Sequence, residues 1–208
     1  MKSLLRAAVV LCVLLCLGAL DGRMSQANTL DLLGAGWNKS QVTVLIKDSE
    51  QLTQQTMLDV TAAVNDWNEV LAGIENAPVL TLVDDAKKAD IVIIIRTGDR
   101  YALGQTLTRT VGRSGCSLRS AFIQLNGEVL GQKISSAGLR SVARHELGHA
   151  LGLRHSDDPS DLMYPLFDYH DLLLDEDVII SDYDRDGIGA IYPLQKHCPV
   201  PDFLFWDE

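Results

Sequence analysis

A cluster of histidines with one glutamate, between positions 145 and 155, offers side chains that can bind a metal ion and use it. His145 and His149 stand four positions apart, so on a helix both imidazoles project from one face toward a single ion. Glu146 lies at the edge of that face, where its carboxylate can contact a metal-bound water without being a ligand. The spacing therefore predicts a zinc site with a general base beside it.

The residues after this helical segment predict how the site is completed. Gly152 can adopt a left-handed conformation at no steric cost, which ends the helix and turns the chain. His155 can then return toward the ion as a third ligand. Three protein ligands leave a fourth coordination position open, which is typical of catalytic zinc. We therefore expect one zinc ion held by His145, His149 and His155, with Glu146 as the catalytic base.

The segment that follows His155 resembles that of one clan of zinc peptidases. Met163 stands at a distance from the third histidine that resembles the Met-turn of the metzincins. Ser156, directly after the ligand, and the run Met163-Tyr164-Pro165 resemble the matrixin branch, the matrix-metalloproteinase-like enzymes. The resemblance implies that Met163 provides an apolar floor beneath the imidazoles and makes no bond to the metal.

The resemblance to matrixins implies a secreted zinc endopeptidase that cuts extended polypeptides. Zinc on neutral imidazoles lowers the pKa of its water toward ~7, and Glu146 would take that proton as the water attacks a peptide carbonyl. Pro165, Leu166 and Phe167 would form the wall of the pocket for the side chain after the cut, although matrixins typically have tyrosine where Phe167 stands. The polar segment 103–109 is an expected edge strand that can pair with the substrate backbone.

Two other functions stay open at this point. An exported zinc-binding protein could keep a vestigial metzincin site, but the presence of Glu146 argues against it because a zinc store needs no general base. A zinc peptidase restricted to chain ends is the other alternative, although the sequence shows no insertion that would close the cleft.

Hydrophobic periodicity predicts the elements that must hold this site. Apolar runs predict four strands, and a weakly alternating polar segment over 103–111 predicts a fifth at the edge of the sheet. Apolar residues at helical spacing predict two long helices, with Trp67 and Met57 in the core. The resemblance, which extends over 36–192, implies an α/β (α+β) metzincin fold. That fold has a twisted five-stranded mixed sheet, two long helices above the zinc cleft and a small C-terminal subdomain with one helix. The predicted strands are 42–46, 79–83, 89–95, 103–111 and 121–125, and the predicted helices are 51–71 and 136–151.

The acidic segment Asp182–Gly187 resembles the start of a calcium-binding EF-hand loop. The glutamate that closes such a loop would fall at position 193, which is Pro193. Ser181 as an N-cap and Asp184 three positions later instead predict the start of a helix. Zinc is therefore the expected cofactor, and calcium stays an open alternative that no motif supports.

The beginning of the chain predicts a signal peptide. Lys2 and Arg6 precede an apolar run over 7–17, and small residues before Ala27 suit cleavage there. The run is shorter than the ~20 residues that a membrane span requires, so we favour cleavage over an anchor. The expected organisation is a signal peptide over 1–27, a short leader over 28–36, a catalytic domain over 37–194 and a C-terminal tail over 195–208.

Length and charge limit the partners. The 208 residues are enough for one domain with a sizeable core. The formal net charge of −10 becomes −12 after cleavage, because three cations and one anion leave with residues 1–27. Such acidity argues against nucleic acid and anionic membranes as partners. We expect an extracellular monomer whose partners are polypeptide substrates.

Cys116 and Cys198 remain after cleavage, and in an exported chain we expect them to form a disulfide bond. Titration of two free thiols in the exported protein would contradict this pairing. Cys116 is wrongly placed to be a latency thiolate, which matrixins carry before the catalytic domain.

Asp31, in the expected leader, suggests another means of latency. A carboxylate oxygen is a competent zinc ligand, so Asp31 could cap the zinc until the leader is removed. The alternative is that Asp31 is only a polar residue of a terminal segment. Equal activity of the parent chain from Asn28 and its Asp31→Ala variant would leave the capping hypothesis without support.

Overall fold

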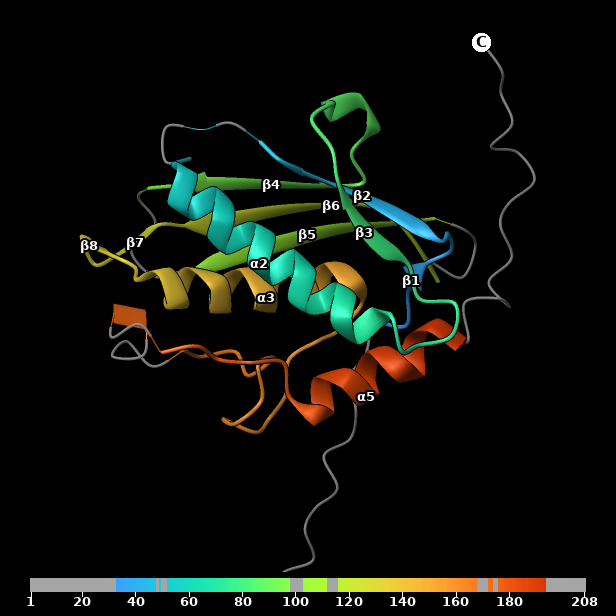
Figure 1. Ribbon diagram of the computed structural model, residues 1–208. Coiled ribbons are helices and arrows are strands. Elements are labelled where there is room, and N and C mark those ends of the chain that lie inside the picture. The colour runs from blue at the N-terminus through green and yellow to red at the C-terminus, as the bar shows by residue number, and fades with distance from the viewer. Residues whose placement is uncertain are drawn as a thin grey trace, which may run out of the picture.

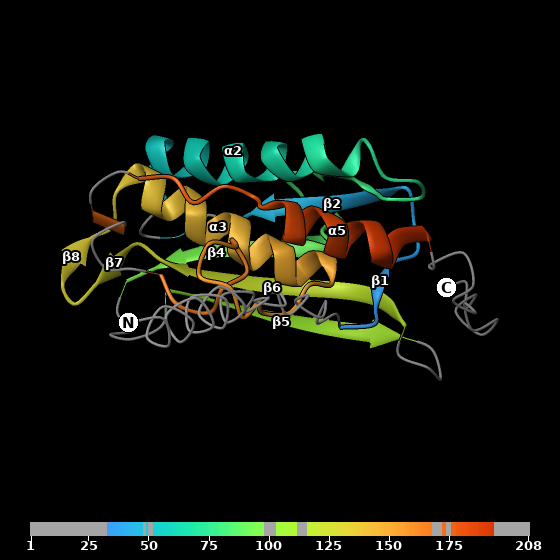
Figure 2. The ribbon, with the colours of Figure 1, turned by 90° about the horizontal axis from the view of Figure 1, so that it is seen from below.

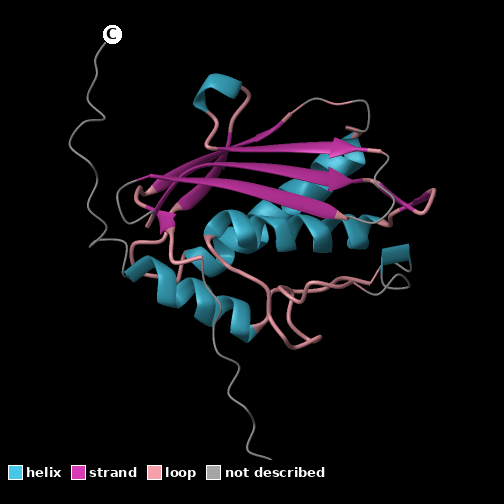
Figure 3. Ribbon diagram, turned by 180° about the vertical axis from the view of Figure 1, so that it is seen from behind, coloured by secondary structure: helices cyan, strands magenta, loops and turns pink. Residues whose placement is uncertain are grey.

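The computed structural model describes residues 33–47, 49, 52–97, 103–111, 116–167, 172–173 and 176–193. In this part of the chain a twisted sheet forms one layer (Figure 1). The long helices α2 (Gln54–Leu71) and α3 (Ser136–Leu151) cover one face of that sheet (Figure 2). A third helix, α5 (Asp182–Ile191), lies farther from the sheet, beyond α3, as Figure 3 also shows from behind.

The main sheet is mixed and contains all five predicted strands. Its path runs through β3 (Val79–Leu82), β2 (Gln41–Ile46), β4 (Ile91–Arg96) and β6 (Ser117–Asn126), all in parallel pairs. β5 (Gly104–Val111) pairs antiparallel with β6. The short β1 (Gly36–Trp37) pairs parallel with the start of β6 and was missed, because two residues show no alternating pattern. The predicted α/β (α+β) class with a mixed sheet is confirmed, with a sixth strand added to the expected five.

The core lies between the sheet and the two long helices. Two tryptophans that are 1% exposed or less cross this layer and reach the backbone of α3. The indole N–H of Trp37 donates to the carbonyl of Ala150 over 2.8 Å, and that of Trp67 donates to the carbonyl of Arg144 over 2.8 Å. Met57, expected in the core, is 38% exposed, so that expectation was wrong.

Local hydrogen bonds set the starts of the helices. Ser135 is the N-cap of α3, and its side chain accepts from the backbone N–H of Gly138. Ser181 and Asp184 form a capping box at the start of α5, as the sequence predicted. The acidic segment 182–187 is thus part of a helix, where two carboxylates in the first turn complement the helix dipole.

Ion pairs join α2, α3 and the segment before α5. Arg144, whose side chain is 9% exposed, pairs with Asp66 at 2.6 Å and with Asp177 at 2.8 Å. Arg140 pairs with Asp59 at 3.2 Å and with Asp177 at 2.8 Å. Burial raises the pKa of Asp177, but hydrogen bonds from Arg140 and Arg144 outweigh it, and the net result is a pKa below 3.8. These ion pairs hold the segment around Asp177 against α3.

Residues 33–36, which the sequence placed in the leader, contact the folded unit. Ala35 is 1% exposed, and the N–H of Leu33 donates to the carbonyl of Gly152 over 2.9 Å. The predicted signal peptide and residues 28–32 lie outside the described residues. Within the described part, no helix is long and apolar enough to cross a membrane.

A small hairpin, β7 (Glu128–Val129) and β8 (Gln132–Lys133), precedes α3. Its turn places Leu130 and Gly131 at φ 51° and 79°. Two-residue hairpin turns with positive φ at both positions favour Asn-Gly, whereas a leucine in this region is strained. Leu130 is also 60% exposed, so little burial offsets the strain.

We expect Leu130→Asn to raise the free energy of unfolding by about 0.5–1 kcal/mol, because asparagine tolerates the left-handed conformation. Urea unfolding measures this change. Leu166→Asn is the control. Leu166 is an exposed leucine too, at 71%, but its backbone lies outside the positive-φ region, where Asn76 and Leu130 are the described non-glycine residues. An equal shift in both variants would show that polarity, rather than backbone strain, is the cause.

Candidate active site

The three predicted ligands come together at the end of α3. His145 and His149 project from the last two turns of the helix, and Gly152 ends it with φ 112° and ψ 3°. The turn brings His155 back, and one nitrogen from each of the three rings lies within 4.8 Å of the others. Among the described residues this is the group of histidines, cysteines and acids that could hold a metal ion.

Backbone carbonyls orient two of the rings. Nδ1 of His145 lies 2.7 Å from the carbonyl oxygen of Leu162, and Nδ1 of His149 lies 2.9 Å from that of Leu153. Each contact requires the proton on Nδ1, which leaves the lone pair of Nε2 for a metal. Nε2 of His149 lies 3.1 Å from Nε2 of His155, so the two face each other.

Burial also keeps two of the three imidazoles, those of His145 and His149, neutral. It lowers the pKa of His145 to about 3, and the neighbouring His149 adds to this effect. Burial lowers the pKa of His149 as well. Neutral imidazoles are the form that binds zinc. Three imidazole nitrogens from the protein leave a fourth coordination position for a water or substrate, which fits a catalytic zinc ion.

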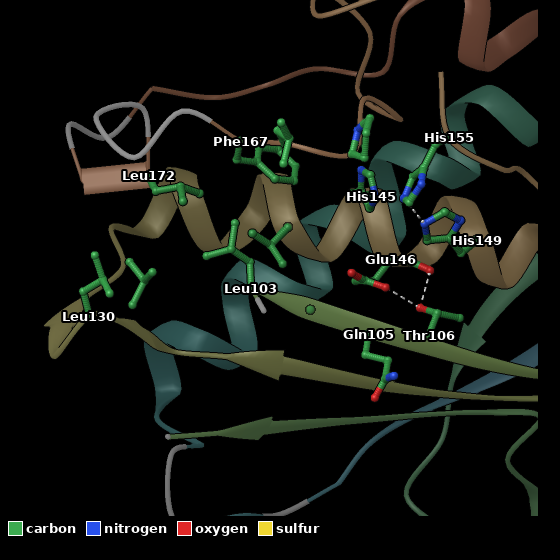
Figure 4. A pocket seen from close by; sticks show the side chains of 15 residues that line it. Leu103, Gln105, Thr106, Leu130, His145, Glu146, His149, His155, Phe167 and Leu172 are labelled. Atoms are coloured by element: carbon green, nitrogen blue, oxygen red, sulfur yellow. Dashed lines mark hydrogen bonds between the residues drawn. The ribbon is translucent and has the colours of Figure 1, made fainter. Parts of the chain in front are cut away.

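Glu146 lies on the side of α3 that faces β5 (Figure 4). Its side chain is buried, and this burial raises its pKa to about 7, although a hydrogen bond from Thr106 lowers it in part. The Thr106 hydroxyl donates to Oε2 of Glu146 over 2.7 Å. A carboxyl group with a pKa near neutrality suits proton transfer in both directions.

Met163 packs against α3 at Gly148, which lies between His145 and His149 in the helix. Met163 is 1% exposed, and a Cβ added to Gly148 of α3 would lie 2.5 Å from its Sδ, so the glycine permits this close packing. The buried carboxylate of Asp184 accepts from the backbone N–H of Leu162 at 3.1 Å and of Met163 at 3.3 Å. The helix α5 therefore holds the Met-turn through the same residue that caps its own first turn.

A cavity of about 610 Å³ extends from the three histidines along α3 (Figure 4). Pro165, Leu166 and Phe167 line it, and their role as the wall of a substrate pocket stays a prediction. The Phe167 ring lies edge-on to His145 with centroids 5.4 Å apart. Sequence reasoning did not find the other apolar lining residues, which come from the position before β5, the hairpin, α3 and position 172. These are Leu103, Val129, Leu130, Val142 and Leu172.

Two expected residues cannot be placed. Asp31 and Cys198 lie outside the described residues. Cys116 is disulfide-bonded, and its partner is not among the described residues, so the pairing with Cys198 stays a prediction.

Comparison with known proteins defines the class to which this fold and site belong. The sequence model that describes the matrixin family of peptidases matches residues 36–193 of this chain. This range covers most of the chain, and the chain belongs to the matrixin family.

Individual relatives agree with this assignment. The chain is 29% identical over 178 residues to macrophage metalloelastase of Oryctolagus cuniculus, a match that covers 79% of this chain and 35% of that protein. It is 31% identical over 148 residues to metalloendoproteinase 1-MMP of Arabidopsis thaliana, covering 62% and 38%. A shorter match of 66 residues, 54% identical, joins it to interstitial collagenase of Sus scrofa, covering 29% and 13%. The chain thus spans little more than a third of the first two relatives.

Proposed function

We propose that this protein is a zinc-dependent endopeptidase that hydrolyses internal bonds of extended polypeptides. The observation that carries the proposal is the convergence of three imidazoles and one buried glutamate at the end of a large cavity. His145, His149 and His155 would hold the zinc. When bound there, zinc supplies Lewis acidity, which polarises a peptide carbonyl and acidifies a water.

Glu146 is the proposed general base. Its carboxylate takes a proton from the attacking water and passes it to the nitrogen of the leaving amine. The pKa near 7 supports both steps, because the group can accept the proton at neutral pH and release it again. A vestigial zinc store would have no use for a carboxyl group in this environment.

The substrate is proposed to lie along β5. This strand pairs with β6 on one side, and its residues alternate between half-buried and exposed over most of its length. An extended peptide can add to such an edge through backbone hydrogen bonds. The apolar end of the cavity, with Phe167 and Leu172 in its lining, then accepts an apolar side chain of the peptide.

Cleavage of casein with and without a chelator tests the function. We expect internal cleavage by the zinc-loaded protein, complete loss after zinc removal and recovery when zinc is returned. Release of single residues from chain ends would support the exopeptidase alternative. Zinc binding at one ion per chain with no cleavage would support the vestigial site.

The setting of the enzyme is also a proposal. We infer secretion through a signal peptide over 1–27, because the sequence pattern is that of a cleaved leader. Determination of the N-terminus of the exported protein by mass spectrometry tests it, and an intact Met1 would contradict it. The same measurement shows whether Asp31 is retained or removed.

A further inference from the structure

Two residues of β5 face the carboxylate of Glu146 from the sheet. Gly104 and Thr106 are alternate residues, so their side-chain positions lie on the same face of the strand. That face is turned toward α3 (Figure 4). They meet Glu146 although 40 positions separate Thr106 from it in the chain.

Thr106 binds Glu146 at two points. Its hydroxyl lies 2.7 Å from Oε2 and 3.0 Å from the backbone carbonyl oxygen of Glu146. A hydroxyl has one proton to donate, so donation to the charged oxygen is the stronger of the two bonds. This contact selects one orientation of the carboxylate. Its Oε2 accepts from Thr106, and its Oε1 receives no hydrogen bond from that hydroxyl.

Gly104 leaves the space that this orientation needs. A Cβ at position 104 would meet Oε1 of Glu146 and would lie 2.6 Å from its Cγ and 2.7 Å from its Cδ. Any larger residue at position 104 therefore displaces the Glu146 side chain. The carboxylate can move because it is the end of a flexible side chain. We therefore expect little change in the free energy of unfolding.

We propose that Thr106 and Gly104 are positioning residues for the catalytic base: the Thr106 hydroxyl holds the Glu146 carboxylate in its productive orientation, and Gly104 keeps that place free. This inference rests on the proposed function. Neither residue reacts with the substrate; both act through Glu146. A general base contributes only when it is held within hydrogen-bonding reach of its proton, so a small displacement has a large effect on turnover.

The first test compares peptide hydrolysis by the zinc-loaded variants. We expect Thr106→Val to lower kcat about 10- to 100-fold with KM within about threefold of the parent value, which matches the loss of one hydrogen bond to a charged group. Thr106→Ser keeps the hydroxyl and should restore most of the turnover. Thr97→Val is the control, because Thr97 is an exposed threonine outside β5 and outside the cavity lining and should leave kcat unchanged.

Gly104→Ala is the second arm. It keeps Thr106 but occupies the place of the carboxylate, so we expect kcat to fall about 100-fold while zinc content and the urea midpoint stay close to those of the parent. Parent-like kcat in Gly104→Ala, or in both Thr106→Val and Thr106→Ser, would overturn the proposal.

Urea unfolding of the zinc-loaded protein supplies a measurement that does not depend on activity. Thr106→Val should lower the unfolding midpoint in the parent background and lower it less when Glu146 is already alanine, since the carboxylate acceptor is then absent and only the backbone carbonyl acceptor remains. Equal shifts in both backgrounds would overturn the positioning role. If the parent protein cleaves no peptide, the proposed function fails, and this coupling still decides whether Thr106 holds Glu146.

Discussion

Replacement of Glu146 by glutamine is expected to lower kcat for peptide cleavage by about four to six orders of magnitude, because the base and the nucleophile act as one unit. Glutamine has the size of glutamate and keeps an oxygen that can accept from Thr106, so the shape of the site should persist. What it loses is the ability to take a proton. Zinc should remain bound at the parent stoichiometry, since the proposed ligands are the three histidines.

Turnover of a fluorogenic peptide and metal content by elemental analysis measure the two quantities separately. Glu128→Gln is a matched control, because Glu128 is half-buried in the hairpin and does not line the cavity. Retention of even a hundredth of the parent kcat in Glu146→Gln would show that another group takes the proton. Loss of zinc from this variant would instead identify Glu146 as a ligand.

Replacement of Gly152 by alanine is expected to lower the free energy of unfolding by about 3 kcal/mol, the largest effect on stability that we predict. The φ of 112° at this position is disfavoured for any residue with a Cβ. The added Cβ would also meet the backbone carbonyl oxygen of Ala35 and lie 3.0 Å from Cδ1 of Ile191.

The backbone at Ala35 cannot move aside easily, because the adjacent segment is buried and bonded to the same turn. Ala35 is 1% exposed, and the N–H of Leu33 donates to the carbonyl of Gly152. Strain and overlap therefore add, and since the turn also directs His155, we expect weaker zinc binding as well.

Urea unfolding with Gly189→Ala as the control tests this prediction. Gly189 lies inside α5, and a Cβ there would meet nothing within 4 Å. Alanine at that position should raise stability by up to about 1 kcal/mol through helix propensity. A loss below about 1 kcal/mol in Gly152→Ala would mean that the turn relaxes and that its geometry is not essential.

The sequence by itself determined the parts of the protein that depend on local spacing. His145 and His149 share a helix face because of the helical repeat, and Gly152 turns the chain because its backbone is permissive. The limits of α3 and the capping box of Ser181 and Asp184 likewise follow from neighbouring residues. Such features can be predicted because the interacting groups lie within a few positions of each other.

Only the tertiary structure could decide which residues of β5 face α3. These residues in turn determine the surroundings of Glu146. Thr106 and Gly104 lie in a polar strand whose pattern says nothing of a partner about 40 positions away. The second role of Asp184, which holds the Met-turn from 21 and 22 positions away, was hidden in the same way. The physical reason is that packing brings such groups together through long-range contacts, which leave no period in the sequence, and burial among them then sets the pKa of Glu146.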